Sequence, residues 1–227
     1  MRVHSDIRLG VRDALPFLLG VVPFALVTGI ASVDAGLTPV QAVAMSVIVY
    51  AGAAQLAAID LLGSTAPLAV VVGTAIIINL RMMMYSASIA PYLIDLPRRT
   101  RTGMAYFLTD QVYAMSIAEF SRNEERDRVR YFVALGATLW IVWVVCTAIG
   151  VVVGAGVPPE LELSFAVPLI FLALLVPAMK DRPTTVAGGA AGAVAVMAAG
   201  VPFNLGLLIG ALTGVAVGLA VEIGENV

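Results

Sequence analysis

Long stretches without a single charged residue constrain this chain more than any other feature. The charge-free runs cover residues 14–33, 35–59, 61–80, 131–159, 163–179 and 183–221. About 20 apolar residues in a helix match the ~30 Å hydrocarbon core of a bilayer. The last run is long enough for two spans, with a turn expected at Gly200-Val201-Pro202. We therefore predict an all-α integral membrane protein with about seven transmembrane helices (six to eight), forming a single domain over residues 1–227.

The composition indicates a membrane protein and argues against most classes of membrane enzyme. Hydrophobic residues make up 60% of the chain, charged residues 12%, and the mean hydropathy is +0.99. The only histidine, His4, precedes the first span, and the only cysteine is Cys146. A histidine metal site, a Ser-His or Cys-His catalytic pair at membrane depth, and an intramolecular disulfide are thereby excluded. We expect no enzymatic activity, no metal and no cofactor.

Arginine and lysine indicate which loops face the cytoplasm, because positive residues are enriched there. The positive positions are Arg2, Arg8, Arg12, Arg98, Arg99, Arg101, Arg122, Arg126, Arg128, Arg130, Lys180 and Arg182. All of them fall on one side if residues 37–94 cross an odd number of times and 102–120 form a broken, re-entrant or tilted helix. We expect residues 1–13 to be a cytoplasmic segment, and the first span to be retained rather than cleaved as a signal peptide.

Glycine and proline are expected to interrupt several spans. The positions are Gly20-Val21-Val22-Pro23, Gly52, Pro91, Pro168 and Pro177. Interrupted helices in transporters expose backbone dipoles that bind substrate near the middle of the bilayer. Ordinary kinking is the alternative, since both residue types are common in membrane helices.

Arg81 is the first candidate for a binding residue. A charge at membrane depth costs roughly 3 to more than 10 kcal/mol, so it is retained mainly where it faces a cavity, a substrate or a partner charge. On a helix, Arg81, Tyr85, Ser88 and Tyr92 share one face. Its guanidinium suits a carboxylate held by two parallel hydrogen bonds. Alternatively, Arg81 snorkels from the end of a span that stops near Leu80.

Asp110 is the acidic counterpart of Arg81. Tyr106 and Tyr113 stand four residues before and three after it, so both hydroxyls can lie on its face of a helix. A desolvated carboxylate can take up and release a proton near neutral pH, and this favours a role in proton coupling. Asp110 could instead bind an ammonium group, pair with Arg81, or be an N-cap or interfacial residue.

A third group of polar residues lies in the segment that surrounds Gly52. Tyr50, Gly52 and Gln55 occur within six residues, and Gly52 and Gln55 share a helix face. The Gln55 amide could bind substrate. It could equally hydrogen-bond a neighbouring helix, a contact of about 0.6–2 kcal/mol in membranes.

The order of several short motifs resembles the AzlC family, the large subunits of bacterial branched-chain amino-acid exporters. The motifs are Gly20-x-x-Pro23-Phe24, Gly36-Leu37, Met45-Ser46, Ala51-Gly52-Ala53-Ala54-Gln55, Asn79-Leu80-Arg81 and Leu108-Thr109-Asp110. The resemblance continues through Ser164-Phe165-Ala166-Val167-Pro168 and the glycine-rich end. Two positions depart from the family pattern: Met82 stands where histidine is frequent, and Gln111 where an acidic residue is frequent.

This resemblance implies an exporter of branched-chain or similar neutral aliphatic amino acids in a bacterial inner membrane, working with a small AzlD-like membrane subunit. A homo-oligomer is a further candidate assembly, and nucleic acid is not an expected partner. No G-x-x-x-x-G-K-[ST] motif occurs, so ATP is not expected as the direct energy source and proton antiport is the working hypothesis. The substrate-binding candidates are Arg81, Asn79, Gln55, Gly52, Tyr50, Pro23 and Tyr85, with Asp110 for the proton. A passive channel and a purely structural membrane subunit remain the alternatives.

Glycines near the C-terminus predict a helix-packing surface. Gly206, Gly210, Gly214 and Gly218 recur every four residues and form a stripe on one helix face. Glycine lets another backbone approach closely, which favours tight helix pairs in membranes. We expect the preceding span to be the counterpart, through Gly188 and Gly192, with the small subunit or a second copy as alternatives.

Overall fold

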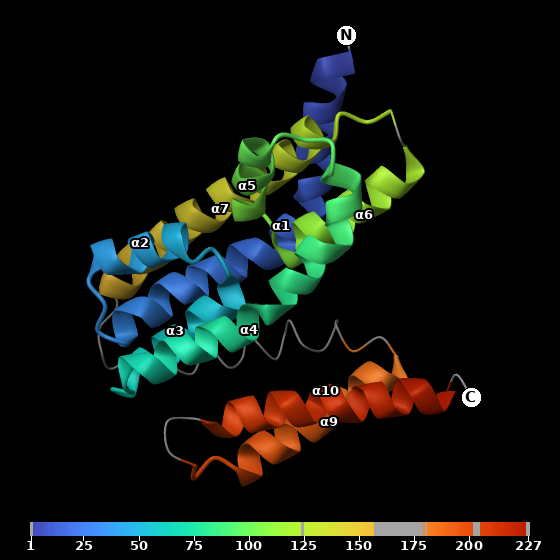
Figure 1. Cartoon of the computed structure of the whole chain (residues 1–227). Helices are drawn as coiled ribbons and strands as arrows, with labels where there is room; N and C mark the ends of the chain where they lie inside the picture. The colour runs from blue at the N-terminus through green and yellow to red at the C-terminus, as the bar shows by residue number, and fades with distance from the viewer. Residues whose placement is uncertain (1, 124, 157–178, 180, 202–204, 226–227) are drawn as a thin grey trace.

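The computed structural model describes all residues except 1, 124, 157–178, 180, 202–204 and 226–227. Every regular element in this described part is helical, which confirms the all-α prediction (Figure 1). Among the described residues, three helices are long and apolar enough to cross a membrane: α1 (Arg2–Asp34), α4 (Leu68–Ile89) with its extension η1 (Ala90–Leu93), and α7 (Arg128–Gly156). The remaining helices are shorter, and the span expected over 163–179 lies outside the described residues. The predicted number of about seven spans therefore stays a prediction.

Helices α1 and α7 pack side by side and form the centre of the molecule. Close approach of the two backbones depends on glycines: Gly29 faces the carbonyl of Thr147, and Gly150 faces the carbonyl of Leu26. A methyl group at either glycine would collide with backbone atoms of the other helix. Near the start of the pair, Gly10 faces Tyr131, so the two helices run in the same direction.

The prediction that the first helix is interrupted at Pro23 is wrong. Helix α1 continues through both Pro16 and Pro23 without a break. Neighbouring helices and Ser/Thr hydroxyls can compensate for a proline in a membrane helix. Here the long contact with α7 supports the backbone on both sides of Pro23.

Helices α2 (Pro39–Ile48) and α3 (Gly52–Gly63) form a hairpin of two half-length helices. Gly63, at the end of the hairpin, packs against Ala35 just beyond the end of α1. The chain therefore enters and leaves this hairpin at the same end of the molecule (Figure 1). The turn itself reaches the middle of α1 and α7, since Gly52 lies against Phe24 and Trp143.

The turn of this first hairpin contains a strained residue. Tyr50 has a φ of 38°, a left-handed conformation that is costly for a bulky side chain. The side chain of Tyr50 is buried at 8% exposure, so packing holds the backbone in this conformation. A break immediately before Gly52 was expected from the sequence, and the structure confirms it.

Helices α5 (Arg98–Tyr106) and α6 (Asp110–Arg122) form a second hairpin, at the opposite end of the molecule. Arg126, just beyond α6, forms ion pairs with Asp6 at the start of α1 and with Glu119. The two carboxylates raise the pKa of the Arg126 guanidinium, with the hydrogen bond to Asp6 as the largest cause. This cluster ties the end of the hairpin to the beginning of α1.

The two hairpins meet at their turns, half-way along the long helices. The Tyr106 hydroxyl at the end of α5 donates to the carbonyl of Val47 near the end of α2. Trp140 of α7 donates its indole N–H to the same hydroxyl over 2.7 Å. A long helix followed by a hairpin thus occurs twice, as α1–α2–α3 and as α4–α5–α6, in opposite directions (Figure 1).

This arrangement meets the condition under which the arginines gather on one side. Residues 37–94 contain one long helix, α4, and residues 102–120 contain none. Contacts of Arg126 with Asp6 and of Arg128 with the carbonyl of Tyr92 bring the arginine-rich ends of α1, α4 and α7 together. The expected break in residues 102–120 is confirmed, since α5 ends at Tyr106 and α6 begins at Asp110.

Helices α9 (Arg182–Met197) and α10 (Leu205–Glu225) pack against each other as a pair. Asp181 caps the start of α9 by accepting a hydrogen bond from the backbone N–H of Thr184, which lowers the pKa of the Asp181 carboxyl. The connection between the two helices includes Gly200 and Val201, as the sequence predicted.

The glycine stripe of α10 is the contact surface of this pair. A methyl group at Gly210 would lie 2.6 Å from the Ala191 carbonyl oxygen, and the other stripe glycines are equally close to α9. The prediction that Gly188 and Gly192 form the other side of this contact is wrong. Alanines fill that role, Ala187, Ala191 and Ala195 within α9 and Ala198 just beyond its end. Alanine is small enough for close approach and costs less helix propensity than glycine.

Candidate functional site

A cavity of about 550 Å³ lies where the two hairpin turns approach α1, α4 and α7. This volume falls within the usual range of small-molecule sites. The lining residues from α1 and α7 are mainly apolar, and the charged and polar ones come from α4, α6 and the turns of the two hairpins. The lining residues are Val21, Phe24, Tyr50, Ala51, Gly52, Ala53, Arg81, Met82, Thr109, Asp110, Gln111, Leu139 and Trp143.

The charged part of this cavity is an ion pair between two helices. The Arg81 guanidinium lies 3.1 Å from the Asp110 carboxylate, and the Tyr85 hydroxyl donates to the same carboxylate over 2.8 Å. Helix α4 continues to Ile89, eight residues beyond Arg81. Arg81 is therefore not at the end of its helix.

Further polar pairs extend from this ion pair along α4 and α6. The Ser88 and Tyr113 hydroxyls lie 2.9 Å apart, and those of Tyr92 and Ser121 lie 3.1 Å apart. The predicted polar face of Arg81, Tyr85, Ser88 and Tyr92 is confirmed by these contacts. Tyr113 pairs with Ser88 rather than with Asp110, although its ring stacks on Tyr85 at a centroid distance of 4.5 Å.

Tyr106 does not share the helix face of Asp110, so that prediction is wrong. The chain breaks between α5 and α6, and Asp110 is the first residue of the new helix. Thr109 is the N-cap residue of α6, and its hydroxyl accepts from the backbone N–H of Val112. Asp110 is therefore not the cap itself but the first-turn acid, a position that the helix dipole favours.

The start of α3 also faces this cavity. Gly52 and Ala53 line it, and the N-cap residue Ala51 provides no side-chain hydrogen bond to the helix start. The first N–H groups of a helix carry partial positive charge and have no partner within the helix. Together with Arg81, the start of α3 gives one side of the cavity a surplus of hydrogen-bond donors.

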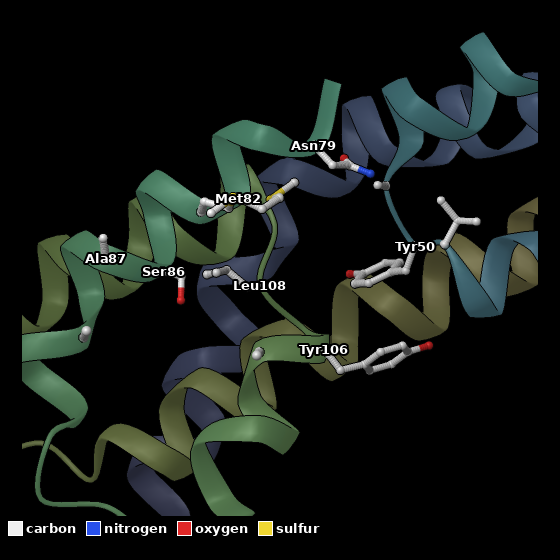
Figure 2. Close-up of a pocket in the computed structure, with 12 residues that line it drawn as sticks. Tyr50, Asn79, Met82, Ser86, Ala87, Tyr106 and Leu108 are labelled. Carbon is white, nitrogen blue, oxygen red and sulfur yellow. The ribbon is translucent and has the colours of Figure 1, made fainter. Parts of the chain in front are cut away.

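A second cavity, of about 680 Å³, lies on the other side of Tyr50 and Met82, which line both cavities. Figure 2 shows Asn79, Met82 and Ser86 on α4 facing this space, with Tyr50 and Tyr106 across from them. The Asn79 side-chain oxygen is buried and has no hydrogen-bond partner among the described residues. Asn79 thus lines the second cavity and not the one that holds the ion pair.

Two other binding candidates have roles in packing. Gln55 is fully buried, and its amide donates to the Ser46 hydroxyl over 2.6 Å, which joins the two arms of the first hairpin. Pro23 lies within α1, next to the cavity residue Phe24. The structure therefore gathers Tyr50, Gly52, Arg81 and Asp110 around one cavity, with Tyr85 behind the ion pair. Gln55 is outside this group.

The apolar wall was missed by reading the sequence. Val21, Leu139 and Trp143 lie in long apolar runs, where nothing distinguishes a cavity residue from one that faces lipid. Phe24 was noted only as part of a motif. One signal was available, since Trp140 and Trp143 are the only tryptophans and are one helical turn apart. Trp143 packs edge-to-face on Phe24 at a centroid distance of 5.4 Å.

Fold and site together define an all-helical, multi-pass membrane protein with a charged cavity at the turns of two broken helices. The family model described as AzlC protein matches residues 16–157. The chain belongs to the AzlC family, which is associated with branched-chain amino-acid transport. The matched region includes both hairpins, α4, all of α7 and the part of α1 from residue 16 onward.

Relatives cover most of this chain. The inner membrane protein YgaZ of Escherichia coli (strain K12) is 27% identical over 90% of this chain and 87% of its own length. An uncharacterized membrane protein of Archaeoglobus fulgidus is 31% identical, with 81% of each chain covered. A third, from Helicobacter pylori, is 26% identical over 74% of this chain and 75% of its own. No solved structure matches the chain.

Proposed function

We propose that this protein exports branched-chain or similar neutral aliphatic amino acids, and that the cavity beside Arg81 and Asp110 holds the substrate. The observation that carries the proposal is the Arg81–Asp110 ion pair in a cavity bounded by two helix breaks. Transporters commonly bind their substrates at such breaks, where half-helix ends and unpaired backbone groups face the solute.

The two walls of the cavity suit the two halves of an aliphatic amino acid. A carboxylate has Arg81 and the start of α3 as partners, and an ammonium group has Asp110. The aliphatic side chain has Phe24, Leu139 and Trp143 on the apolar wall. Because neither charge of a zwitterion can be buried without a partner at low cost, a site with one residue of each sign favours a neutral amino acid.

In this proposal, a proton and the ammonium group of the substrate compete for Asp110. In the structure the Asp110 carboxylate contacts Arg81 and accepts a hydrogen bond from the Tyr85 hydroxyl. The substrate binds with its carboxylate on Arg81 and its ammonium on Asp110, which requires the Asp110 carboxylate to be free of a proton. A proton that binds Asp110 from the opposite side of the membrane displaces the ammonium and favours release of the substrate. The substrate and the proton thus occupy Asp110 alternately, as antiport requires.

The repeated helix-and-hairpin arrangement supports alternating access. Structural repeats of opposite direction allow one half of a transporter to open to one side and the other half to the opposite side. We place the arginine-rich ends, including residues 1–13, in the cytoplasm of a bacterial cell, with the protein in the inner membrane. A small AzlD-like subunit is the proposed partner, and the chain acts as one transporter domain over residues 1–227.

Efflux from proteoliposomes tests this function. Vesicles containing the protein, with and without the small subunit, are loaded with radiolabelled valine, leucine, isoleucine or methionine, and a pH gradient is imposed. We expect efflux of at least one of these amino acids to depend on the gradient. Gradient-independent efflux would indicate a passive facilitator, and no efflux under any condition would reject transport.

A further inference from the structure

The two cavities beside Tyr50 are neighbours that share part of their lining. Tyr50, Ala51 and Met82 line both the cavity of about 550 Å³ that holds the ion pair and the second cavity of about 680 Å³. The first cavity contains Arg81 and Asp110, whereas none of the described residues that line the second one carries a charge. A zwitterion therefore has no ionic partner in the second cavity, and its charges are costly to hold there. The second cavity suits passage of such a solute better than its binding.

Tyr50 is the largest of the shared residues, and its backbone conformation is strained. It lies in the break between α2 and α3, and its φ is 38°. Strained residues of this kind recur at ligand clamps and switch regions, where a second conformation is part of the mechanism. Because Tyr50 belongs to neither helix, a change of its φ and ψ leaves the hydrogen bonds inside both helices intact.

The side chain of Tyr50 is held by packing, in contrast to that of the nearby Tyr106. Figure 2 shows the Tyr50 ring between α4 and Tyr106, and the centroids of the two tyrosine rings are 6.0 Å apart. The Tyr106 hydroxyl is fixed, because it donates to the carbonyl of Val47 and accepts from the indole N–H of Trp140. In the described part of the chain the Tyr50 hydroxyl has no such hydrogen bond. Tyr50 is therefore the tyrosine of this pair that can move at lower cost.

We propose that the two cavities are parts of one solute path and that the side chain of Tyr50, with Met82 of α4, is the gate between them. This inference rests on the proposed transport function and adds the route by which the solute reaches or leaves the ion pair. The structure shows the closed gate, with Tyr50 buried at 8% exposure. Movement of its ring joins the cavities, and the unbranched, flexible side chain of Met82 adapts to the moving neighbour.

Blocking the second cavity tests the path. In a Cys146→Ala background, Ser86→Cys places a thiol in the second cavity. Met84→Cys is the matched control, because position 84 lines neither cavity and two residues along a helix lie on nearly opposite faces. Leucine efflux from proteoliposomes is measured before and after labelling with biotin maleimide. We expect labelled Ser86→Cys to lose most of its efflux and labelled Met84→Cys to keep it. Leucine binding to labelled Ser86→Cys should persist, because the label lies outside the ion-pair cavity.

The outcomes separate the path from the transport function. If the unchanged protein exports no leucine, the transport function fails, and the path with it. If leucine is exported and complete labelling of Ser86→Cys leaves efflux undiminished, only the path is overturned. Failure of the reagent to reach position 86 would also overturn it, because an open path must admit a solute there.

Removing either side of the gate tests the role of Tyr50. Tyr50→Gly removes the ring, and glycine adopts a positive φ without strain, so the turn is retained. Met82→Ala widens the same boundary without altering the turn. We expect both variants to release leucine without a pH gradient much faster than the unchanged protein, and Tyr50→Phe, which keeps the ring, to show no such leak. Gradient-independent efflux as slow in Tyr50→Gly and Met82→Ala as in the unchanged protein would overturn the gate.

Discussion

Among single residues, Arg81 is the one whose charge is most costly to accommodate, because it lies inside an apolar helix and not at its end. Its guanidinium contacts Asp110 at 3.1 Å, and both side chains are about a third exposed, toward the cavity. The pair is therefore open to exchange with a solute and is not a sealed structural bridge. This position makes the charge, the planar shape and the partner of Arg81 separately testable.

Arg81→Ala should reduce efflux about 10- to 100-fold, since a hydrogen bond to a charged group contributes about 1.5–3 kcal/mol. Arg81→Lys should restore only part of the activity, because an ammonium cannot reproduce the planar donor fork. Efflux assays in proteoliposomes with equal amounts of each protein measure the effect. The matched control is Arg99→Ala, at an exposed position of α5. Normal efflux by Arg81→Ala would remove Arg81 from the site.

Asp110→Asn should flatten the dependence of efflux on the pH gradient. The amide keeps the shape of the side chain and can still accept a hydrogen bond from Tyr85, but it cannot bind and release a proton. Efflux is measured over a series of imposed gradients, with Asp95→Asn, in the exposed connection before α5, as the control. If Asp110→Asn responds to the gradient as strongly as the unchanged protein, another group carries the proton.

Among the helical elements, the two hairpins decide the architecture, and each returns to the end from which it enters. The first lies between α1 and α4, and its last residue packs back against Ala35. The second is tied to the start of α1 by Arg126. The hairpins therefore do not cross the molecule, although residues 35–59 are as apolar and as long as a true span.

Cysteine labelling distinguishes hairpins from spans. In a Cys146→Ala background, single cysteines are placed at Asp34 and Ser64, on either side of the first hairpin, and at Asp95 and Arg122, around the second. A membrane-impermeant thiol reagent should label the first two positions from one side of the membrane and the last two from the other. Labelling of positions 34 and 64 from opposite sides would show that α2 and α3 together cross the membrane.

The glycine stripe of α10 gives a second prediction for elements. Gly210→Leu combined with Gly214→Leu should reduce the amount of folded protein, because a side chain at either position collides with α9. Gly189→Leu combined with Gly192→Leu is the matched control, since both positions have open space. Detergent-solubilised yield by size-exclusion chromatography measures the difference. Full yield of the first double mutant with loss of a co-purifying small subunit would instead identify the stripe as a partner interface.

The polar face of α4 and the glycine stripe of α10 could be predicted from sequence because both follow helical periodicity within one element. The break before Gly52 was also predictable, from its local composition. The sequence did not predict that each hairpin returns to the end from which it starts. This property depends on contacts between residues far apart along the chain, such as Gly63 and Ala35. Pro23 shows the reverse case, in which packing of α1 on α7 overrides a local helix-breaking signal.

In the molecule as a whole, a repeated helix-and-hairpin fold surrounds a cavity at the meeting point of its turns. Transport through this cavity is tested by leucine efflux from proteoliposomes under an imposed pH gradient, comparing the unchanged protein with Arg81→Ala and Asp110→Asn. We expect gradient-driven efflux that Arg81→Ala nearly abolishes and that Asp110→Asn uncouples from the gradient. Equal efflux by all three proteins would show that neither residue takes part in transport.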